Sequence, residues 1–224
     1  MIPTGLREAD QAAACAGLRV RGALHPGADA GAPEGTGTLL LLGPDEPGFW
    51  PLFAFSPEYL DGGRDPLDRW SKRVVSALAA DWGGTAIFPS DGPPYAPFLA
   101  WALTSGRAWS SPVGMLVHDA AGLFISYRAA VALPARLPLP TTPASKPCAP
   151  CPRPCETACP VGALAADQTY DVARCKAHIA SVAGTPCRTA GCLVRRACPV
   201  ARGFSRRPEQ SAFHMRAFLG DAAT

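Results

Sequence analysis

The sequence predicts an α+β protein in two parts: an N-terminal domain built on an antiparallel sheet, and a small C-terminal domain of helices and loops. Three observations support this. Helix-like and strand-like apolar stretches alternate as far as residue 133, five prolines gather in residues 133–147, and eight of the nine cysteines follow, from Cys148 to Cys198. The chain of 224 residues suits one large or two small domains. Gly and Pro, 22 and 25 residues, stay below the roughly 25–30% that indicates disorder.

Local patterns predict the first elements of the N-terminal domain. An Ala-rich helix is expected over residues 7–17, followed by strands at Leu18–Leu24 and Thr36–Leu42. A longer helix should begin at Asp65-Pro66, where an acid caps the helix and a proline occupies its first turn, and should end at Gly83-Gly84. The apolar positions of this helix recur at helical spacing: Trp70, Val74, Val75, Leu78 and Ala79.

The rest of this domain is expected to add a strand at Thr85–Phe88 and a helix at Pro97–Thr104. Two apolar, β-branched or aromatic runs follow, Val113–His118 and Leu123–Leu133, and residues 119–122 between them favour a hairpin turn. The predicted domains are residues 1–134 and 148–224, joined by a stiff Pro-rich linker at 135–147. Alternatively, that stretch packs as an extended edge of the first domain.

The redox compartment decides how the cysteines are used. Arg7, Glu8 and Asp10 stand where a secretory signal would need apolar residues, and the longest aliphatic run, Leu39–Leu42, is too short to cross a bilayer. We therefore expect a cytoplasmic protein without a membrane segment. Thiols stay reduced there, so metal thiolates are favoured over disulfides.

The first cysteine group reads Cys148-x2-Cys151-x3-Cys155-x3-Cys159-Pro160, one residue longer than the bacterial iron–sulfur run C-x2-C-x2-C-x3-C-P. Three closely spaced cysteines let one loop wrap three corners of a cubane. In such runs the fourth cysteine, before proline, ligates a different cluster. A second, looser group also ends in Cys-Pro: Cys175, Cys187, Cys192 and Cys198-Pro199.

The two Cys-Pro endings indicate half-sites that exchange their last ligand. One [4Fe–4S] cluster would then use Cys148, Cys151, Cys155 and Cys198. The other would use Cys175, Cys187, Cys192 and Cys159. Two zinc sites with four thiolates each are the alternative, as is a single cluster with the looser group partly structural. Cys15 is expected to be a buried, inert thiol.

The positive charge lies with the cysteines. Residues 1–145 hold 10 Lys/Arg and 13 Asp/Glu, whereas residues 146–224 hold 11 and 5. Scattered arginines and the lack of a recognition motif argue against nucleic acid as the partner. Five of the cations that lie between the expected ligands should raise the reduction potential by stabilising the more negative reduced state: Arg153, Lys176, Arg188, Arg195 and Arg196.

The cysteine segment, residues 146–204, resembles the tandem-cluster ferredoxin domain of epoxyqueuosine reductases and corrinoid reductive dehalogenases. Arg174-Cys175 matches an isolated cysteine between the family's two motifs, and Gly191-Cys192 with Cys198-Pro199 matches the end of the second. The resemblance implies a ferredoxin-like iron–sulfur domain. The spacings from Cys187 to Cys192 and Cys198 are wider than the family pattern.

The first half resembles the CblC-type cobalamin-processing proteins in two stretches. One is Asp65–Trp70, similar to that family's Asp-Pro-x-Asp motif. The other is Gly114–His118 followed by Gly122–Arg128 and Val131–Pro134, similar to its hairpin with an Arg and an aliphatic-Leu-Pro exit. The resemblance implies a nitroreductase-like fold that binds cobalamin base-off, with Arg128 at the position of an Arg that meets a thiol co-substrate. The family's corrinoid-contacting His has no counterpart here, nor has the proton-donating acid of the epoxyqueuosine reductases.

Three polar residues of these stretches also have structural interpretations. Asp65 and Asp68 are expected to be a helix cap and a helix-surface group, and His118 a hairpin-edge residue without a role in a site. Arg128 is the one candidate cofactor-binding residue outside the cysteines, with a strand-surface role as its alternative.

The sequence therefore predicts an iron–sulfur electron-transfer protein with two [4Fe–4S] clusters. A redox partner protein would donate electrons, and a corrinoid (cobalamin) or another acceptor at the N-terminal domain would receive them. The alternatives are an oxidoreductase, namely a cobalamin reductase or decyanase or a small-substrate reductase, and a zinc-stabilised interaction module. What separates them is corrinoid binding by the first domain and the identity of the metal.

Overall fold

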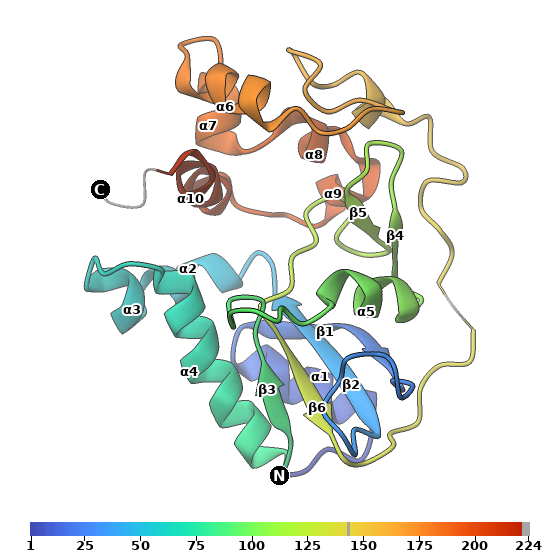
Figure 1. Cartoon of the computed structure of the whole chain (residues 1–224). Coiled ribbons are helices and arrows are strands. Elements are labelled where there is room, and N and C mark those ends of the chain that lie inside the picture. The colour runs from blue at the N-terminus through green and yellow to red at the C-terminus, as the bar shows by residue number, and fades with distance from the viewer. Residues whose placement is uncertain (143, 221–224) are drawn as a thin grey trace. The chain divides into compact units, whose positions relative to one another are not determined.

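The structure is a computed structural model that describes residues 1–142 and 144–220 (Figure 1). Its contacts divide the chain into two compact units, and neither is continuous in sequence. Unit 1 comprises Met1–Ala108 and Ser126–Ala144, and unit 2 comprises Trp109–Ile125 and Ser145–Thr224. Residues 109–125, which the sequence patterns placed in the N-terminal domain, thus pack with the cysteine segment.

Unit 1 is built on the predicted antiparallel sheet. Its strand order is β1-β2-β6-β3, and every neighbouring pair is antiparallel. The strands are β1 Leu18–Leu24, β2 Thr38–Pro44, β3 Thr85–Ile87 and β6 Ala129–Leu133. The leucines of β2, Leu39–Leu42, are all fully buried. Successive strand residues point to opposite faces, so both faces of the sheet are covered at its centre, which explains the continuous apolar run.

Five helices belong to the described part of unit 1: α1 Leu6–Cys15, α2 Phe49–Ala54, α3 Pro57–Leu60, α4 Pro66–Asp81 and α5 Phe98–Thr104. An aromatic cluster joins α2 to α4, with the ring of Phe49 packing edge-on against Trp70 at 5.3 Å between centroids. Trp70 and Trp101 are both 1% exposed, as expected of core residues. Cys15, predicted to be buried, is instead exposed at the end of α1, because the buried face of that helix consists of Ala9 and Ala13.

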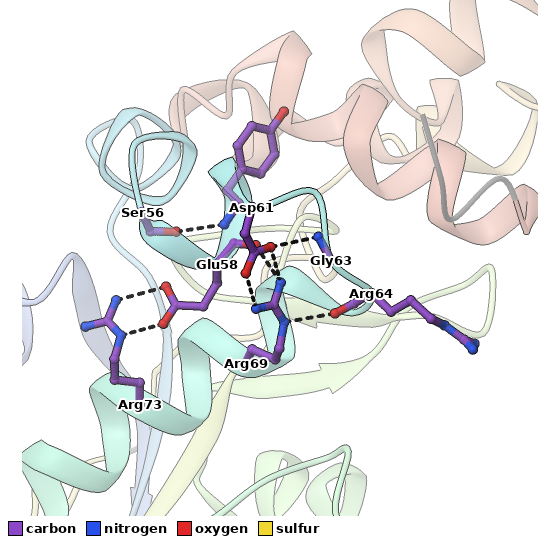
Figure 2. A network of polar contacts seen from close by, with 8 residues as sticks. Ser56, Glu58, Asp61, Gly63, Arg64, Arg69 and Arg73 are labelled. Carbon is purple, nitrogen blue, oxygen red and sulfur yellow. Dashed lines mark hydrogen bonds and ion pairs between the residues drawn. The ribbon is translucent and has the colours of Figure 1, made fainter.

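The start of α4 agrees with the Asp65-Pro66 signal, but Asp65 does not cap the helix with its side chain. Its backbone is left-handed, with φ of 49°, and its carboxylate makes no cap hydrogen bond. Charged pairs fix this end instead (Figure 2). The Arg69 guanidinium donates to both Asp61 carboxylate oxygens, at 2.6 and 2.7 Å, and to the Glu58 carbonyl at 2.7 Å.

Glu58 on α3 pairs in the same way with Arg73 on α4, whose Nε donates to the carboxylate at 2.5 Å (Figure 2). The hydrogen bond from Arg73 lowers the pKa of Glu58 to about 2, and that from Arg69 lowers the pKa of Asp61 to about 2. These pairs tie α3 to α4, so the charged residues around the Asp-Pro-x-Asp stretch have a structural role.

The predicted hairpin between Val113–His118 and Leu123–Leu133 is wrong. Strand β5, Leu116–His118, pairs with β4, Ala108–Ser110, in a separate two-stranded sheet, whereas β6 pairs with β2 and β3. The turn itself exists, closed by one bridge between His118 and Gly122. After this turn the two segments do not pair further, because arginine side chains hydrogen-bond to the next two carbonyls. Arg195 donates to the carbonyl of Leu123, and Arg206 donates to that of Phe124.

The rest of unit 2 is helix and loop, as predicted for the C-terminal part. Its elements are η1 Pro154–Glu156, α6 Val172–Ala180, α7 Thr185–Ala190, α8 Leu193–Ala197, α9 Pro199–Gly203 and α10 Pro208–Leu219. Helix α10 packs against α7 beside Gly191, where a Cβ would lie 2.7 Å from the Cβ of Ser211. In residues 1–142 and 144–220, no helix combines the length and apolar character needed to cross a bilayer.

Candidate metal centre

The eight predicted ligand cysteines lie in unit 2, and their thiols interact electrostatically in two sets of four. In the first set, Cys155 interacts with Cys148, Cys151 and Cys198. In the second set, Cys175 interacts with Cys159, Cys187 and Cys192. The structure thus brings together the cysteines that the ligand-exchange hypothesis grouped. Their role as ligands stays a prediction.

Short local elements position the first set. Cys155 lies in the 3₁₀ turn η1, and Cys151 accepts a hydrogen bond on Sγ from the Arg153 N–H at 3.3 Å. Cys198 arrives from the other end of the segment, at the junction where α8 ends and α9 begins. Because a residue before proline is driven out of the helical region, Cys198 adopts φ −61° and ψ 121°. The Cys-Pro dipeptide therefore breaks the helix at the point where this thiol joins the first set.

The second set uses three helical elements and one loop. Cys175 projects from α6, Cys187 from α7, and Cys192 occupies the position just before α8. Cys159 comes from the loop that follows η1, and its Sγ accepts a hydrogen bond from the Ala163 N–H at 3.2 Å. Gly191 makes the turn before Cys192 with a backbone φ of +88°, a conformation that residues other than glycine rarely adopt.

Burial is the main cause that raises the pKa of four of these thiols, and the neighbouring thiols add to it: Cys148, Cys155, Cys175 and Cys187. Both effects disfavour the negative thiolate. A bound metal reverses this by deprotonating coordinating thiols outright. Two groups of crowded, partly buried thiols therefore suit a metal cofactor better than they suit free thiolates.

Hydrogen-bond donors and cations surround both sets. Backbone N–H groups donate to Cys151 in the first set and to Cys159 in the second, and Tyr170 lies near Cys175 and Cys192. Three of the five cations predicted to act on the clusters lie near these thiols: Arg153 near Cys148, Arg195 near Cys192 and Arg196 near Cys187.

The other two predicted cations have different contacts. The Arg188 guanidinium donates to the Ile179 and Ser181 carbonyls, so it closes the end of α6. The ammonium of Lys176 lies over the Phe218 ring, 5.3 Å from its centroid. Position between the ligands in sequence was therefore an incomplete guide to which charges approach the sulfurs.

The donor chemistry of both sets fits an all-thiolate cofactor. Soft thiolates select zinc, copper(I) or iron–sulfur clusters. Among the described residues, no three Cys, His, Asp or Glu side chains converge on a point that could hold one metal ion. A cubane does not require that convergence, because each of its four irons takes a single thiolate at its own corner.

A pocket of about 550 Å³ in unit 2 borders the first set. Cys148 lines it together with the cations Lys146 and Arg153, and the Ser111 hydroxyl beside it is buried without a hydrogen-bond partner among the described residues. Sequence reasoning missed Ser111 and Tyr170. Proximity in sequence to Cys175 was the only available signal for Tyr170, and Ser111 had none.

The polar residues singled out outside the cysteines are divided between the units. His118, in unit 2, is fully buried, and its Nδ1 accepts the N–H groups of Ala120 and Ala121 at 3.1 and 3.2 Å. It therefore holds the turn. Arg128, in unit 1, is half-buried, and its Nε has no hydrogen-bond partner among the described residues. Burial lowers its pKa, while the charge of exposed Asp68 on α4 acts in the opposite sense.

The comparisons with known proteins do not assign this chain to a family. A scan against family models, a search of curated proteins and a search of solved structures each found no match. The motif resemblances therefore remain expectations, and a functional assignment has to rest on the two cysteine sets and on the groups around them.

Proposed function

We propose that this chain is an iron–sulfur electron-transfer protein that holds two [4Fe–4S] clusters in unit 2. The observation that carries the proposal is the grouping of eight thiols into two sets of four, each completed by a Cys-Pro cysteine from the other sequence motif. The first set would hold one cluster and the second set the other. Each cluster would supply a one-electron couple.

The surroundings of the thiols support this assignment. Backbone N–H groups donate to the sulfurs, and arginines lie beside them. Such groups stabilise the added negative charge of a reduced cluster and so raise its potential. In this proposal, unit 2 is a ferredoxin-like module that accepts electrons from a redox partner protein.

Unit 1 would hold the acceptor, in a nitroreductase-like arrangement. Two buried polar atoms near the start of β6, Arg128 Nε and Ser126 Oγ, have no hydrogen-bond partner among the described residues. Arg128 Nε is a donor and the Ser126 hydroxyl can act as one, so they favour a ligand rich in carbonyl or carboxylate oxygens, a description that the amide-bearing rim of a corrinoid meets. This observation also supports the second candidate function, a cobalamin reductase or decyanase.

Anaerobic purification with metal analysis tests the cluster proposal. We expect a brown protein with broad absorption at about 400 nm, and with about eight irons and about eight sulfides per chain. About four irons would correct the number of clusters. A colourless, zinc-loaded protein would overturn the proposal in favour of a zinc-stabilised module.

Titration with hydroxocobalamin tests the acceptor. We expect a base-off spectrum on binding, weaker binding by Arg128→Gln, and unchanged binding by Arg136→Gln, a matched change at an exposed position of unit 1. Turnover of a bound cobalamin by the reduced protein would favour the enzyme over the carrier. The corrinoid proposal fails if the spectrum does not change at high protein concentration.

A further inference from the structure

We propose that the pocket of about 550 Å³ in unit 2 binds a small zwitterion, a molecule with a carboxylate at one end and an ammonium at the other, such as an amino acid or a short peptide. The volume lies within the roughly 300–1,000 Å³ that is typical of small-molecule sites. The inference goes beyond the proposed function and does not depend on it, because it rests on the groups that line the pocket and not on the metal that the thiols hold.

The pocket lies beside the place proposed for the first cluster and not in it. Of the first set, Cys148 lines the pocket, whereas Cys151, Cys155 and Cys198 do not. The wall comes from four short segments of unit 2: residues 110–112, 146–149, 153–156 and 166–167. The segment 109–125 therefore contributes to a cavity in the unit that it joins.

Opposite charges line the pocket in equal number: two cations, Lys146 and Arg153, and two carboxylates, Glu156 and Asp167. Arg153 Nη1 lies 3.7 Å from Glu156 Oε1, too far for a hydrogen bond, so both groups can still bind a ligand. Among the described residues, the side chains of Lys146 and Asp167 form no ion pair. A ligand with one kind of charge would meet two groups of its own sign, so the wall complements a ligand that carries both.

Ser111 adds a neutral hydrogen-bonding group to the wall. Its N–H donates to the Met115 carbonyl at 2.9 Å, and its own carbonyl accepts the Gly114 N–H at 3.1 Å. The turn thus satisfies both backbone groups, but the hydroxyl of this 7% exposed residue has no partner in the part of the chain that the structure describes. Because buried polar groups are normally paired, this hydroxyl favours a ligand with a polar end in the pocket.

The backbone of two charged wall residues points in the same direction. Arg153 and Asp167 have φ of 55° and 57°, and they are two of the four residues other than glycine with a positive φ in the described ranges. A left-handed backbone is unfavourable for a residue with a Cβ, and such residues are concentrated at sites that hold ligands. One cation and one carboxylate are therefore held in unusual conformations around the same cavity.

Calorimetric titration of the iron-loaded protein with glycine, diglycine and triglycine tests the proposal. These probes carry the same two charged ends at increasing separation, so the tightest one reports the span that the site accepts. We expect saturable binding of at least one of them. Its N-acetyl and C-amide derivatives, which each lack one charge, should bind about tenfold more weakly, because each loses a charge-assisted hydrogen bond.

Variants of the wall test the location. Lys146→Met and Asp167→Asn should each weaken binding of the preferred probe by about tenfold. Ser111→Ala should weaken it by about threefold without lowering the thermal stability, because it removes a hydroxyl that has no partner in the free protein. Arg202→Gln and Glu209→Gln, at exposed positions of unit 2 away from the pocket, are the matched controls and should bind as the wild type does.

The outcomes separate this inference from the proposed function. An iron-free wild type that still binds the probe overturns the proposed function alone, and an iron-loaded wild type that binds none of the three probes overturns the inference alone. The inference also fails if the N-acetyl or C-amide derivative binds as tightly as its parent, since one charge would then suffice. Unchanged binding by the three wall variants would place the site elsewhere and overturn it as well.

Discussion

The two units of this molecule are stabilised in different ways. Unit 1 has a sheet whose central strand buries four consecutive leucines, flanked by aromatic residues from α2 and α4. Among the largest fully buried side chains of the described residues, Leu123 and Ile179 belong to unit 2, and the others belong to unit 1. Unit 2 consists of helices and loops with the strand β5, and three of its cysteines are among its buried residues.

This difference shows what each unit needs in order to fold. Apolar burial stabilises a domain at about 25 cal/mol per Å², and unit 1 has a sheet and a core through which to gain it. Unit 2 has fewer large buried side chains and withdraws three cysteines from water, and polar groups are costly to bury without partners. In small metal-dependent domains, the free energy of metal binding is also folding free energy. The folding of unit 2 should therefore depend on the proposed clusters, and that of unit 1 should not.

Removing iron gives the strongest test of whether unit 2, unlike unit 1, needs a metal for its stability. After anaerobic chelation, amide hydrogen exchange should accelerate throughout residues 145–220 and 109–125, because the cysteine sets no longer join their segments. The strands of unit 1 should keep their protection. Equal loss of protection in both units would show that they do not differ in this way.

Single cysteine substitutions test which thiols hold the iron. Cys155→Ala should remove the cluster of the first set, about half of the iron, whereas Cys15→Ala, at an exposed thiol outside both sets, should keep all of it. Iron and sulfide analysis of the two purified variants measures the difference. Equal iron in both variants would contradict the assignment of Cys155 as a ligand.

A truncation in the core of unit 1 tests whether this unit can be destabilised without affecting unit 2. Leu41 on β2 is fully buried, so Leu41→Ala should lower the free energy of unfolding of unit 1 by about 2–5 kcal/mol. Denaturant unfolding followed by tryptophan fluorescence measures this, since every tryptophan except Trp109 lies in that unit. The visible spectrum at low denaturant should stay as in the wild type. A bleached spectrum would mean that the units are not independent.

The turn of residues 119–122 offers a smaller, more local test. A Cβ on Gly122 would lie 2.5 Å from the Ala201 nitrogen and 2.9 Å from Cys198 Sγ, and the backbone there has φ of +54°. Gly122→Ala should therefore destabilise unit 2 by roughly 1–3 kcal/mol and loosen the first set, with a loss of iron that metal analysis detects.

Gly114 provides the matched control for that substitution. It also has a positive φ, +75°, but a Cβ there meets nothing within 4 Å. Gly114→Ala should show the backbone strain of about 1 kcal/mol alone, without loss of iron. Comparable iron loss in the two variants would point to strain, and not to the approach toward Cys198.

The smallest expected effect concerns pH and unit 1. The Arg73 hydrogen bond lowers the pKa of Glu58 to about 2, below its value of about 4.3 in an unfolded chain. The stabilisation is present above the unfolded pKa and is lost as the pH falls toward 2. Because Arg73 is half-exposed, we expect no more than about 1 kcal/mol.

The Glu58→Gln variant tests whether this stabilisation is present at neutral pH and lost in acid. Its unit 1 should unfold more easily than the wild type at about pH 7 and about equally at about pH 2, as thermal scans at both pH values would show. A difference that persists in acid would mean that the carboxylate charge is not its source.

Sequence reasoning predicted the parts of the fold that local patterns control. The helix from Pro66 and the strand Leu18–Leu24 appear where capping chemistry and apolar periodicity placed them. The pairing of the run after Gly122 was wrong, since a turn signal cannot say which strand a segment will join. That choice is made by distant groups: the Arg195 and Arg206 side chains for residues 123–124, and the leucines of β2 for β6.

The candidate site could likewise be predicted only where it depends on local sequence. Cysteine spacing and the two Cys-Pro dipeptides indicated which thiols to group, because both are written in the local sequence. The contacts of Tyr170, Ser111 and Arg195 could not be inferred. They depend on α10, on the segment 109–125 and on the packing of α8, which bring residues together across long stretches of chain.

The close approach of Gly122 to Cys198 has a consequence for how this protein can be taken apart. A fragment that starts after the Pro-rich stretch contains every predicted ligand, yet it lacks the segment whose carbonyls receive Arg195 and Arg206. Unit 2 is therefore not a cassette that evolution or an engineer could transplant by a single cut. A working graft would have to include residues 109–125. The two separate coding regions that supply unit 2 therefore cannot be exchanged independently of each other.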